Sequence, residues 1–198
     1  DIALRAKVVD RDKPNDLALL KTSAPMDIPN VARFYPLEEQ LSKNARVVTV
    51  GYPKNDDATT DFPEFATADG HILSVDDFAM KNGSKPLIIN NITEQGFSGG
   101  PVLDSSGNII GVLLAGTCIS ESCRENFARA ASVDVHSLED KTAMSQALKK
   151  VMDANMAASL QMVSSFLHKN RLEPQEGGLS GPPTAERMKE LAESVVNV

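Results

Sequence analysis

Residues 96–103 read, in order, Gly96-Phe97-Ser98-Gly99-Gly100-Pro101-Val102-Leu103. A serine that acts as a nucleophile needs an exposed hydroxyl on a tight turn, with backbone N–H groups directed at the oxyanion that develops during attack. Glycine permits such backbone geometry because it lacks a Cβ atom. The glycines around Ser98 therefore make this serine a candidate nucleophile. On these residues alone, an ordinary glycine-rich turn is the alternative.

The size and charge of the chain narrow the class of protein. Its 198 residues suit one domain, or one domain with an appendage. Twenty Lys and Arg residues against 27 Asp and Glu residues give a formal net charge of −7. Because nucleic-acid-binding surfaces are usually basic, this balance argues against a broad one. No apolar run approaches about 18 residues, so the sequence predicts no membrane-spanning segment.

Short apolar runs separated by turn-forming residues fill the first 140 positions. Asn82-Gly83 and the segment 104–108 each separate two such runs and predict hairpins, and Asp69-Gly70 separates two further runs. The runs expected to be strands are 2–9, 17–20, 46–50, 65–68, 71–75, 77–81, 86–90, 102–103 and 109–114. Many short strands with regular turns are typical of a sandwich or a barrel.

The pattern changes after about residue 140. Residues 143–170 contain neither Gly nor Pro, and apolar side chains recur there every three or four positions, at Met144, Leu148, Val151, Met152, Met156, Leu160, Val163 and Leu167. This spacing predicts an amphipathic helix of about 27 residues. A linker rich in Gly and Pro follows, and Thr184 is a candidate N-cap of a short last helix.

The sequence thus divides into three expected parts. Residues 1–140 form the β domain, 141–170 the long amphipathic helix, and 171–198 a linker plus a short helix. The long helix could pack on the β domain or form a dimer. Its methionine-rich face (Met144, Met152 and Met156) is interpreted as core, and the alternative is a peptide-binding groove.

With the motifs in order, the chain resembles the trypsin-like serine peptidases, and most closely the bacterial high-temperature-requirement (HtrA/Deg) branch. Residues 96–101 match the nucleophile motif of that family, and 15–20 (Asn-Asp-Leu-Ala-Leu-Leu) match the segment that carries its aspartate. Residues 47–53, 68–74 and 107–112 resemble further strands of the family, in the same order. The resemblance covers about residues 1–140.

The resemblance implies a mainly β fold of two barrels, of which this chain would hold the second and an incomplete first, with a helical C-terminal extension. It makes Ser98 the nucleophile and Asp16 the residue that orients a histidine. The N–H groups of Gly96 and Ser98 would form the oxyanion hole. The alternative for Asp16 is that it caps the turn before Leu17.

The resemblance also suggests where a substrate side chain binds. In the resembling fold the strand after the serine lines the primary specificity pocket, here Leu113, Leu114 and Ala115, and Ile92 would lie at its base. An apolar pocket cannot compensate for burying a Lys or Arg head group. We therefore expect small or medium apolar residues before the scissile bond. The alternative is that Ile92 is simply a core residue.

A general base is the part that the sequence lacks. In trypsin-like chains the histidine precedes the aspartate, yet no histidine precedes Asp16 here. His71, His136 and His168 all follow it, and we interpret them as surface or locally bonded residues. We expect an N-terminal segment of the same protein to supply the histidine and the missing strands. The rival hypothesis is a catalytically inactive module that binds peptides with the same barrel.

The remaining expectations concern partners and surroundings. The substrate would be a polypeptide, no metal or organic cofactor is required, and the long helix could form a homo-oligomer. Cys118 and Cys123 are either a small-loop disulfide in an oxidising compartment or two free thiols. The disulfide interpretation and the habit of the family together suggest a periplasmic or secreted protein.

Overall fold

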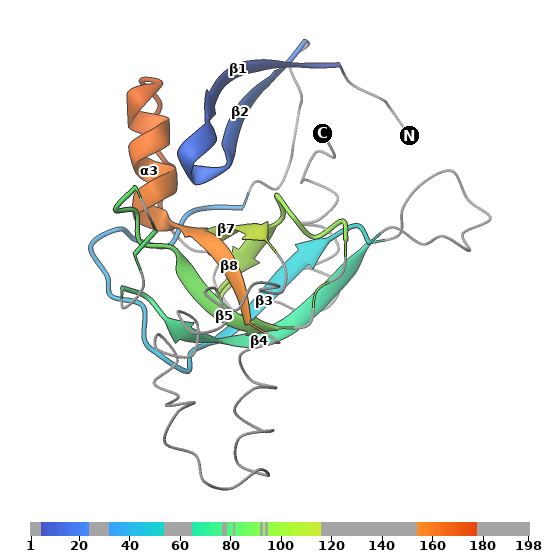
Figure 1. Ribbon diagram of the computed structural model, residues 1–198, viewed down its shortest axis with the longest axis vertical. Coiled ribbons are helices and arrows are strands. Elements are labelled where there is room, and N and C mark those ends of the chain that lie inside the picture. The colour runs from blue at the N-terminus through green and yellow to red at the C-terminus, as the bar shows by residue number, and fades with distance from the viewer. Residues whose placement is uncertain are drawn as a thin grey trace, which may run out of the picture.

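The structure, a computed structural model, consists mainly of antiparallel strands (Figure 1). It describes residues 5–23, 32–53, 65–76, 79–80, 82–91, 93, 95–115 and 154–177. The elements are β1 (Ala6–Asp12), the 3₁₀ turn η1 (Lys13–Asn15), β2 (Leu17–Thr22), β3 (Arg46–Gly51), β4 (Ala66–Ser74), β5 (Leu87–Asn91), β6 (Pro101–Leu103), β7 (Ile109–Ala115), β8 (Ala154–Ser159) and α3 (Leu160–Lys169).

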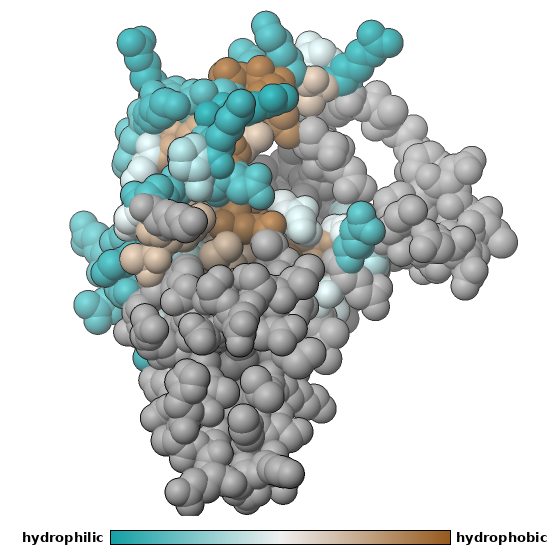
Figure 2. All heavy atoms as spheres, viewed as in Figure 1, coloured by the Kyte–Doolittle hydropathy of each residue, from teal (hydrophilic) through white to brown (hydrophobic). Residues whose placement is uncertain are grey.

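Strands β1 and β2 form a two-stranded antiparallel hairpin that lies beside α3 (Figure 1). Their register shifts between Val8 and Asp10. Val8 and Val9 are 38% and 52% exposed, and hydrophobic surface at this end of the molecule is surrounded by hydrophilic side chains (Figure 2).

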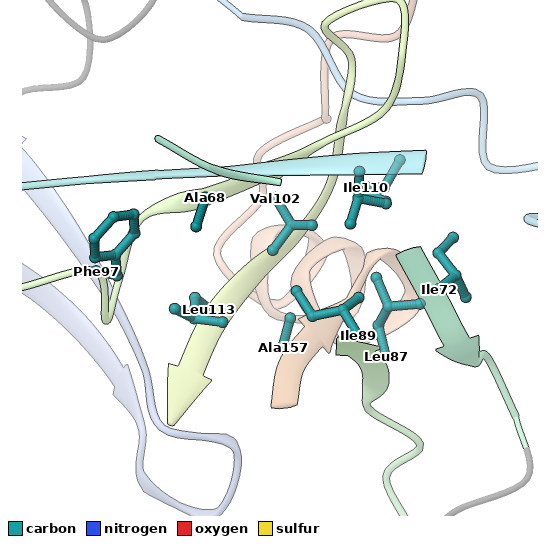
Figure 3. Close-up of a cluster of buried hydrophobic side chains, with 10 residues drawn as sticks. Ala68, Ile72, Leu87, Ile89, Phe97, Val102, Ile110, Leu113 and Ala157 are labelled. Atoms are coloured by element: carbon teal, nitrogen blue, oxygen red, sulfur yellow. The ribbon is translucent and has the colours of Figure 1, made fainter. Parts of the chain in front are cut away.

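Strands β3 to β8 form a closed barrel in the order β3-β4-β5-β8-β7-β6, with every neighbouring pair antiparallel. Closure pairs β3 with β6, so no strand of the barrel keeps a free edge. Ten buried side chains from the strands and the Ser98 turn meet inside it, and nine are labelled in Figure 3. This barrel core is Val47, Ala68, Ile72, Leu87, Ile89, Phe97, Val102, Ile110, Leu113 and Ala157.

In strand β4, buried and exposed residues alternate, which is the pattern expected of a strand with one face toward a core. Ala68, Gly70 and Ile72 are buried, whereas the intervening Asp69 and His71 are exposed. The break expected between two strands at Asp69-Gly70 was wrong, because β4 runs through both residues. A Cβ atom on Gly70 would lie 2.1 Å from the Asn90 carbonyl oxygen, so this glycine allows a close approach of β5 and makes no turn.

The expected helix over 143–170 was wrong for residues 154–159. These residues form β8, which lies between β5 and β7 and pairs Ala157 with both Leu87 and Leu113. The barrel is therefore not complete within residues 1–140, and the helix α3 begins only at Leu160. Pairing with two neighbouring strands overrides the helix propensity of the alanines.

A missed signal was available in the composition of this region. No Asp, Glu, Lys or Arg occurs from Ala154 to His168. A surface helix carries a charged face, whereas a strand buried on both faces does not. The apolar side of α3 also packs inside the chain, because Leu160, Met162, Val163 and Phe166 are buried.

Three further expectations concern the strand at 77–81, the turn at Asn82-Gly83 and the short last helix. Residues 79–80 are not in a strand, and Met80 instead begins a tight turn closed by Gly83 N–H to Met80 O at 2.9 Å. The Asn82-Gly83 turn itself is confirmed, since Gly83 has a φ of 84°. The short last helix, Cys118 and Cys123 lie outside the described residues.

The position of Ala157 in the barrel core predicts a difference between two neighbouring residues of β8. Ala157 is fully buried inside the barrel, whereas Met156 is half-buried on the other face. We expect Ala157→Leu to lower the free energy of unfolding by about 1–3 kcal/mol through overpacking. Met156→Leu conserves volume and should lower it by less than about 1.5 kcal/mol. Urea unfolding measures both, and equal stabilities would mean that Ala157 does not face the barrel core.

Candidate active site

Ser98 is exposed on a turn that is hydrogen-bonded to β7 through the two residues that follow the serine. Gly99 N–H donates to Leu113 O at 2.8 Å, and Leu113 N–H donates to Gly100 O at 2.9 Å. Gly100 N–H donates to Phe97 O at 2.9 Å and closes the turn. The serine hydroxyl is therefore presented at the surface on a fixed backbone, as a nucleophile requires.

The turn lies so close to β3 that two of its positions have no room for a side chain. A Cβ atom on Gly96 would lie 2.1 Å from Tyr52 O, and one on Gly100 would lie 2.0 Å from Val50 O. Gly96 also has a φ of 109°, which residues with a side chain rarely adopt. Phe97, between Gly96 and the serine, is buried in the barrel core (Figure 3). A buried anchor and these close approaches together fix the shape of the turn.

The N–H groups of Gly96 and Ser98 fit the expected oxyanion hole in one respect. Within the described part of the chain, neither donates to a backbone carbonyl, whereas the N–H groups of Gly99 and Gly100 do. An oxyanion hole needs N–H groups that are not engaged with a backbone carbonyl. Their role in the oxyanion hole stays a prediction.

Asp16 lies at the tip of the β1–β2 hairpin, directly after η1. Its backbone is left-handed, with φ 53° and ψ 44°, and its N–H donates to Lys13 O at 3.3 Å. Asp16 therefore caps the C-terminal end of η1 through its backbone N–H, as the alternative interpretation of this residue expected. The side chain is exposed, so its carboxylate remains accessible to another segment of protein.

The hairpin that carries Asp16 is docked on the barrel next to α3. Leu17, directly after Asp16, packs against the helix-side cluster, whose buried members are Leu114, Ala158, Met162 and Val163. Asp10 accepts hydrogen bonds from Lys169 Nζ at 2.9 Å and Asn170 Nδ2 at 3.1 Å. Sequence reasoning missed this second contact, which joins residues 160 positions apart. The sequence around Asp10, Lys169 and Asn170 contains no local pattern that predicts this contact, because each of these residues is of a type common on protein surfaces.

The residues expected to line a substrate pocket are not brought together as exposed side chains. Leu113 is buried in the barrel core and Leu114 in the helix-side cluster. Ala115 ends β7 and pairs through its backbone with Met156, while its side chain and the whole of Ile92 lie outside the described residues. The preference for apolar residues before the scissile bond stays a prediction.

The two described histidines are each bonded to a residue other than Ser98. His71 is exposed on β4, where its N–H donates to Asn90 Oδ1 at 2.6 Å. His168 is exposed on α3 and pairs with Glu173 at 2.8 Å. His136 lies outside the described residues. Among the residues described, therefore, neither histidine is hydrogen-bonded to Ser98 or Asp16.

The described segments hold no cluster of three His, Cys, Asp or Glu residues arranged to bind a metal ion. In the same segments, no helix has the length and apolar character needed to cross a lipid bilayer.

With this geometry in view, sequence comparison identifies the family. The trypsin-like peptidase domain family matches residues 1–112. The chain belongs to this family. No match to a curated protein sequence was found. The match includes both Asp16 and the turn that carries Ser98.

Solved structures show the same fold at low sequence identity. The active form of the Rv3671c protease of M. tuberculosis superposes with a TM-score of 0.53 and 21% identity, over 88% of this chain and 62% of that one. An inactive form of the Rv3671c protease gives a TM-score of 0.50 and 22% identity, over 84% and 67%. This trypsin-like peptidase domain thus spans about two thirds of the length of those structures. At such identities the likeness shows the fold.

The close approach of the Ser98 turn to β3 predicts unequal effects of three glycine substitutions. Gly96→Ala and Gly100→Ala each place a Cβ atom against a backbone carbonyl, whereas Gly99→Ala meets nothing within 4 Å. Gly99 has a φ of 85°, so its substitution costs about 1–2 kcal/mol of backbone strain alone. We expect Gly96→Ala and Gly100→Ala each to lower the free energy of unfolding by at least about 3 kcal/mol. Chemical unfolding of the three variants measures this, and a Gly100→Ala protein as stable as Gly99→Ala would contradict the close approach.

The contact between Asp10 and Lys169 predicts a pH dependence of hairpin docking. Hydrogen bonds from Lys169, Arg11 and Asn170 lower the pKa of Asp10 below its ordinary value of 3.8, and Asp10 raises the pKa of Lys169 above 10.5. The contact therefore stabilises the fold from about pH 4 to about pH 10. It is lost as pH falls through the lowered pKa of Asp10, and as pH rises through the raised pKa of Lys169.

Unfolding of the unmodified protein and of Asp10→Asn by urea checks this pH dependence. We expect the unmodified protein to be the more stable near pH 7, with the difference decreasing as pH falls through the lowered pKa of Asp10. High salt should also reduce the difference, since both side chains are partly exposed to solvent. A difference that grows on acidification would contradict the assignment.

Proposed function

We propose that this chain is the larger part of a serine endopeptidase that hydrolyses peptide bonds through an acyl-enzyme at Ser98. One observation carries the proposal. In a member of the trypsin-like peptidase family, Ser98 is exposed on a turn whose neighbouring positions are fixed by hydrogen bonds to β7 and by the buried Phe97. A serine without a catalytic function in a surface loop would not require a backbone that is fixed in this way.

The proposed reaction follows from the groups around the serine. Ser98 Oγ attacks the scissile carbonyl carbon while a histidine takes the hydroxyl proton. The N–H groups of Gly96 and Ser98 stabilise the oxyanion, and such a donor contributes about 10²–10³ in rate. The histidine then protonates the leaving amine as the C–N bond breaks. A water molecule hydrolyses the resulting ester by the same route and regenerates Ser98.

We infer that the histidine comes from a segment of the same protein outside residues 1–198. The β1–β2 hairpin supports this inference, because a two-stranded sheet is marginal on its own and here exposes Val8 and Val9. A recess of about 440 Å³ lies on the same hairpin, lined by Lys7, Val8, Val9, Lys21, Thr22 and Ser23. Further strands of the first barrel would cover this face and bring the histidine to the Asp16 carboxylate.

The second candidate function is a peptide-binding module without catalysis. The observation that favours it is the placement of His71 and His168, each engaged with a partner other than Asp16 or Ser98. This alternative uses the same barrel and differs only in whether a general base reaches the serine.

A fluorophosphonate probe distinguishes the two functions, since it reacts with an activated serine. We expect the complete natural protein to gain one adduct, located at Ser98 by mass spectrometry of peptides, and Ser98→Ala to gain none. Residues 1–198 alone should react at least about 10³-fold more slowly, because the general base is missing. Asp16→Asn in the complete protein should lose roughly 10⁴ in rate, the magnitude known for such triads.

Two results would decide against parts of the proposal. An unlabelled complete protein that still binds unfolded polypeptide would place the peptide-binding module first. Equal labelling of residues 1–198 and of the complete protein would overturn the external histidine.

A further inference from the structure

The tight turn from Met80 to Ser84 belongs to the barrel side of the molecule but reaches the tip of the hairpin. Met80 N–H donates to Ser84 O at 2.8 Å, and Gly83 N–H donates to Met80 O at 2.9 Å. The Met80 side chain packs against the helix-side cluster. The turn is therefore held to the barrel at its first residue, which leaves the side chain of Asn82 to extend toward η1.

Asn82 makes two hydrogen bonds to the hairpin. Its Nδ2 donates to Asn15 Oδ1 at 2.8 Å and to Pro14 O at 3.3 Å. Its Oδ1 accepts from Ser84 N–H at 3.0 Å. Because a backbone N–H can only donate, this last bond fixes which end of the amide is the oxygen. The two donors of Asn82 must therefore face the hairpin.

The orientation continues through Asn15. Asn15 Nδ2 donates to Asp12 Oδ2 at 2.7 Å, and an ionised carboxylate can only accept. Asn15 Oδ1 is thereby directed at Asn82. The chain of amides runs from the barrel-side turn into the last residue before Asp16, and each of its hydrogen bonds joins a donor to an acceptor.

The hairpin tip needs such support because its own backbone is weakly held. The turn η1 has only three residues, and the hydrogen bond from Asp16 N–H to Lys13 O is long, at 3.3 Å. Asp16 itself has a left-handed backbone, with a φ of 53°, which residues with a side chain adopt less readily than glycine. The contact between Asp10 and Lys169 lies on β1, away from the tip, and Leu17 anchors only the residue after Asp16.

We propose that Asn82 is a positioning residue for Asp16: its side-chain amide holds the η1 turn on the barrel that carries Ser98, and so fixes where the Asp16 carboxylate meets its histidine. The catalytic part of this inference depends on the function proposed above. The structural part, that Asn82 orders the hairpin tip, does not.

The test uses a matched pair of substitutions in the complete natural protein. Asn82→Asp keeps the oxygen that accepts from Ser84 and removes both donors to the hairpin. Asn90→Asp is the control, because it keeps the oxygen that accepts from His71 N–H on β4 and adds the same charge away from the hairpin. Asn82→Ala serves as a second variant that adds no charge.

Two measurements are made on each protein. Amide hydrogen exchange over residues 12–17 should be about threefold to tenfold faster in both Asn82 variants, the factor for one or two lost hydrogen bonds, and unchanged in Asn90→Asp. The rate of fluorophosphonate labelling of Ser98 should fall by about tenfold to 10²-fold in the Asn82 variants, since small misplacements of catalytic groups have effects of this size. In Asn82→Ala the acid limb of the pH–rate profile should move to lower pH, because a displaced carboxylate stabilises the imidazolium less.

Each outcome has a defined meaning. Unchanged exchange at residues 12–17 would overturn the ordering role of Asn82, whatever the activity. Faster exchange with an unchanged labelling rate and pH profile would overturn the positioning role. If the unsubstituted protein is not labelled at Ser98, the proposed function fails and the catalytic part of this inference fails with it, while the exchange data still decide the structural part.

Discussion

The insertion of β8 between β5 and β7 is the constraint on which the rest of the structure depends. Without it, both neighbouring strands would present unpaired N–H and C=O groups, and the barrel would be open. The residues of β8 are small enough to lie against close neighbours: Ala157 and Ala158 are fully buried, and the carbonyl oxygen of Ala158 would meet a Cβ on Gly111 at 2.7 Å. Helix α3 starts directly after this strand, so β8 also sets where the hairpin can dock.

Closure of the barrel gives the Ser98 turn a rigid support. Strand β7, held between β6 and β8, accepts and donates the hydrogen bonds that fix Gly99 and Gly100. Strand β3 limits the turn from the other side, where only glycine fits. The contacts of the turn with β7 and β3 thus hold Ser98 at the surface on a fixed backbone. Preorganised catalysis requires such a fixed backbone.

The two halves of the proposed catalytic apparatus belong to different pieces of structure. Ser98 is part of the barrel, and Asp16 is part of a hairpin attached by the Asp10–Lys169 contact, by Leu17 and by Asn82. All of these attachments are exposed or only partly buried, so the relative placement of the two residues depends on a few side-chain contacts. Such an interface is where assembly with the remainder of a first barrel would affect activity.

The sequence by itself determined the local features of this protein: the serine turn, the turns at 80–84 and 104–108, and the alternation of the strands. In the second of these turns, Asp104 Oδ1 accepts the N–H groups of Ser106 and Asn108, a contact made within five residues. Only the tertiary structure decided that Ala154–Ser159 is a strand, that Gly70 lies inside β4, and that Asn82 reaches Asn15. Each of these depends on a partner distant in the chain, and neither helix periodicity nor a turn-forming dipeptide carries information about that partner.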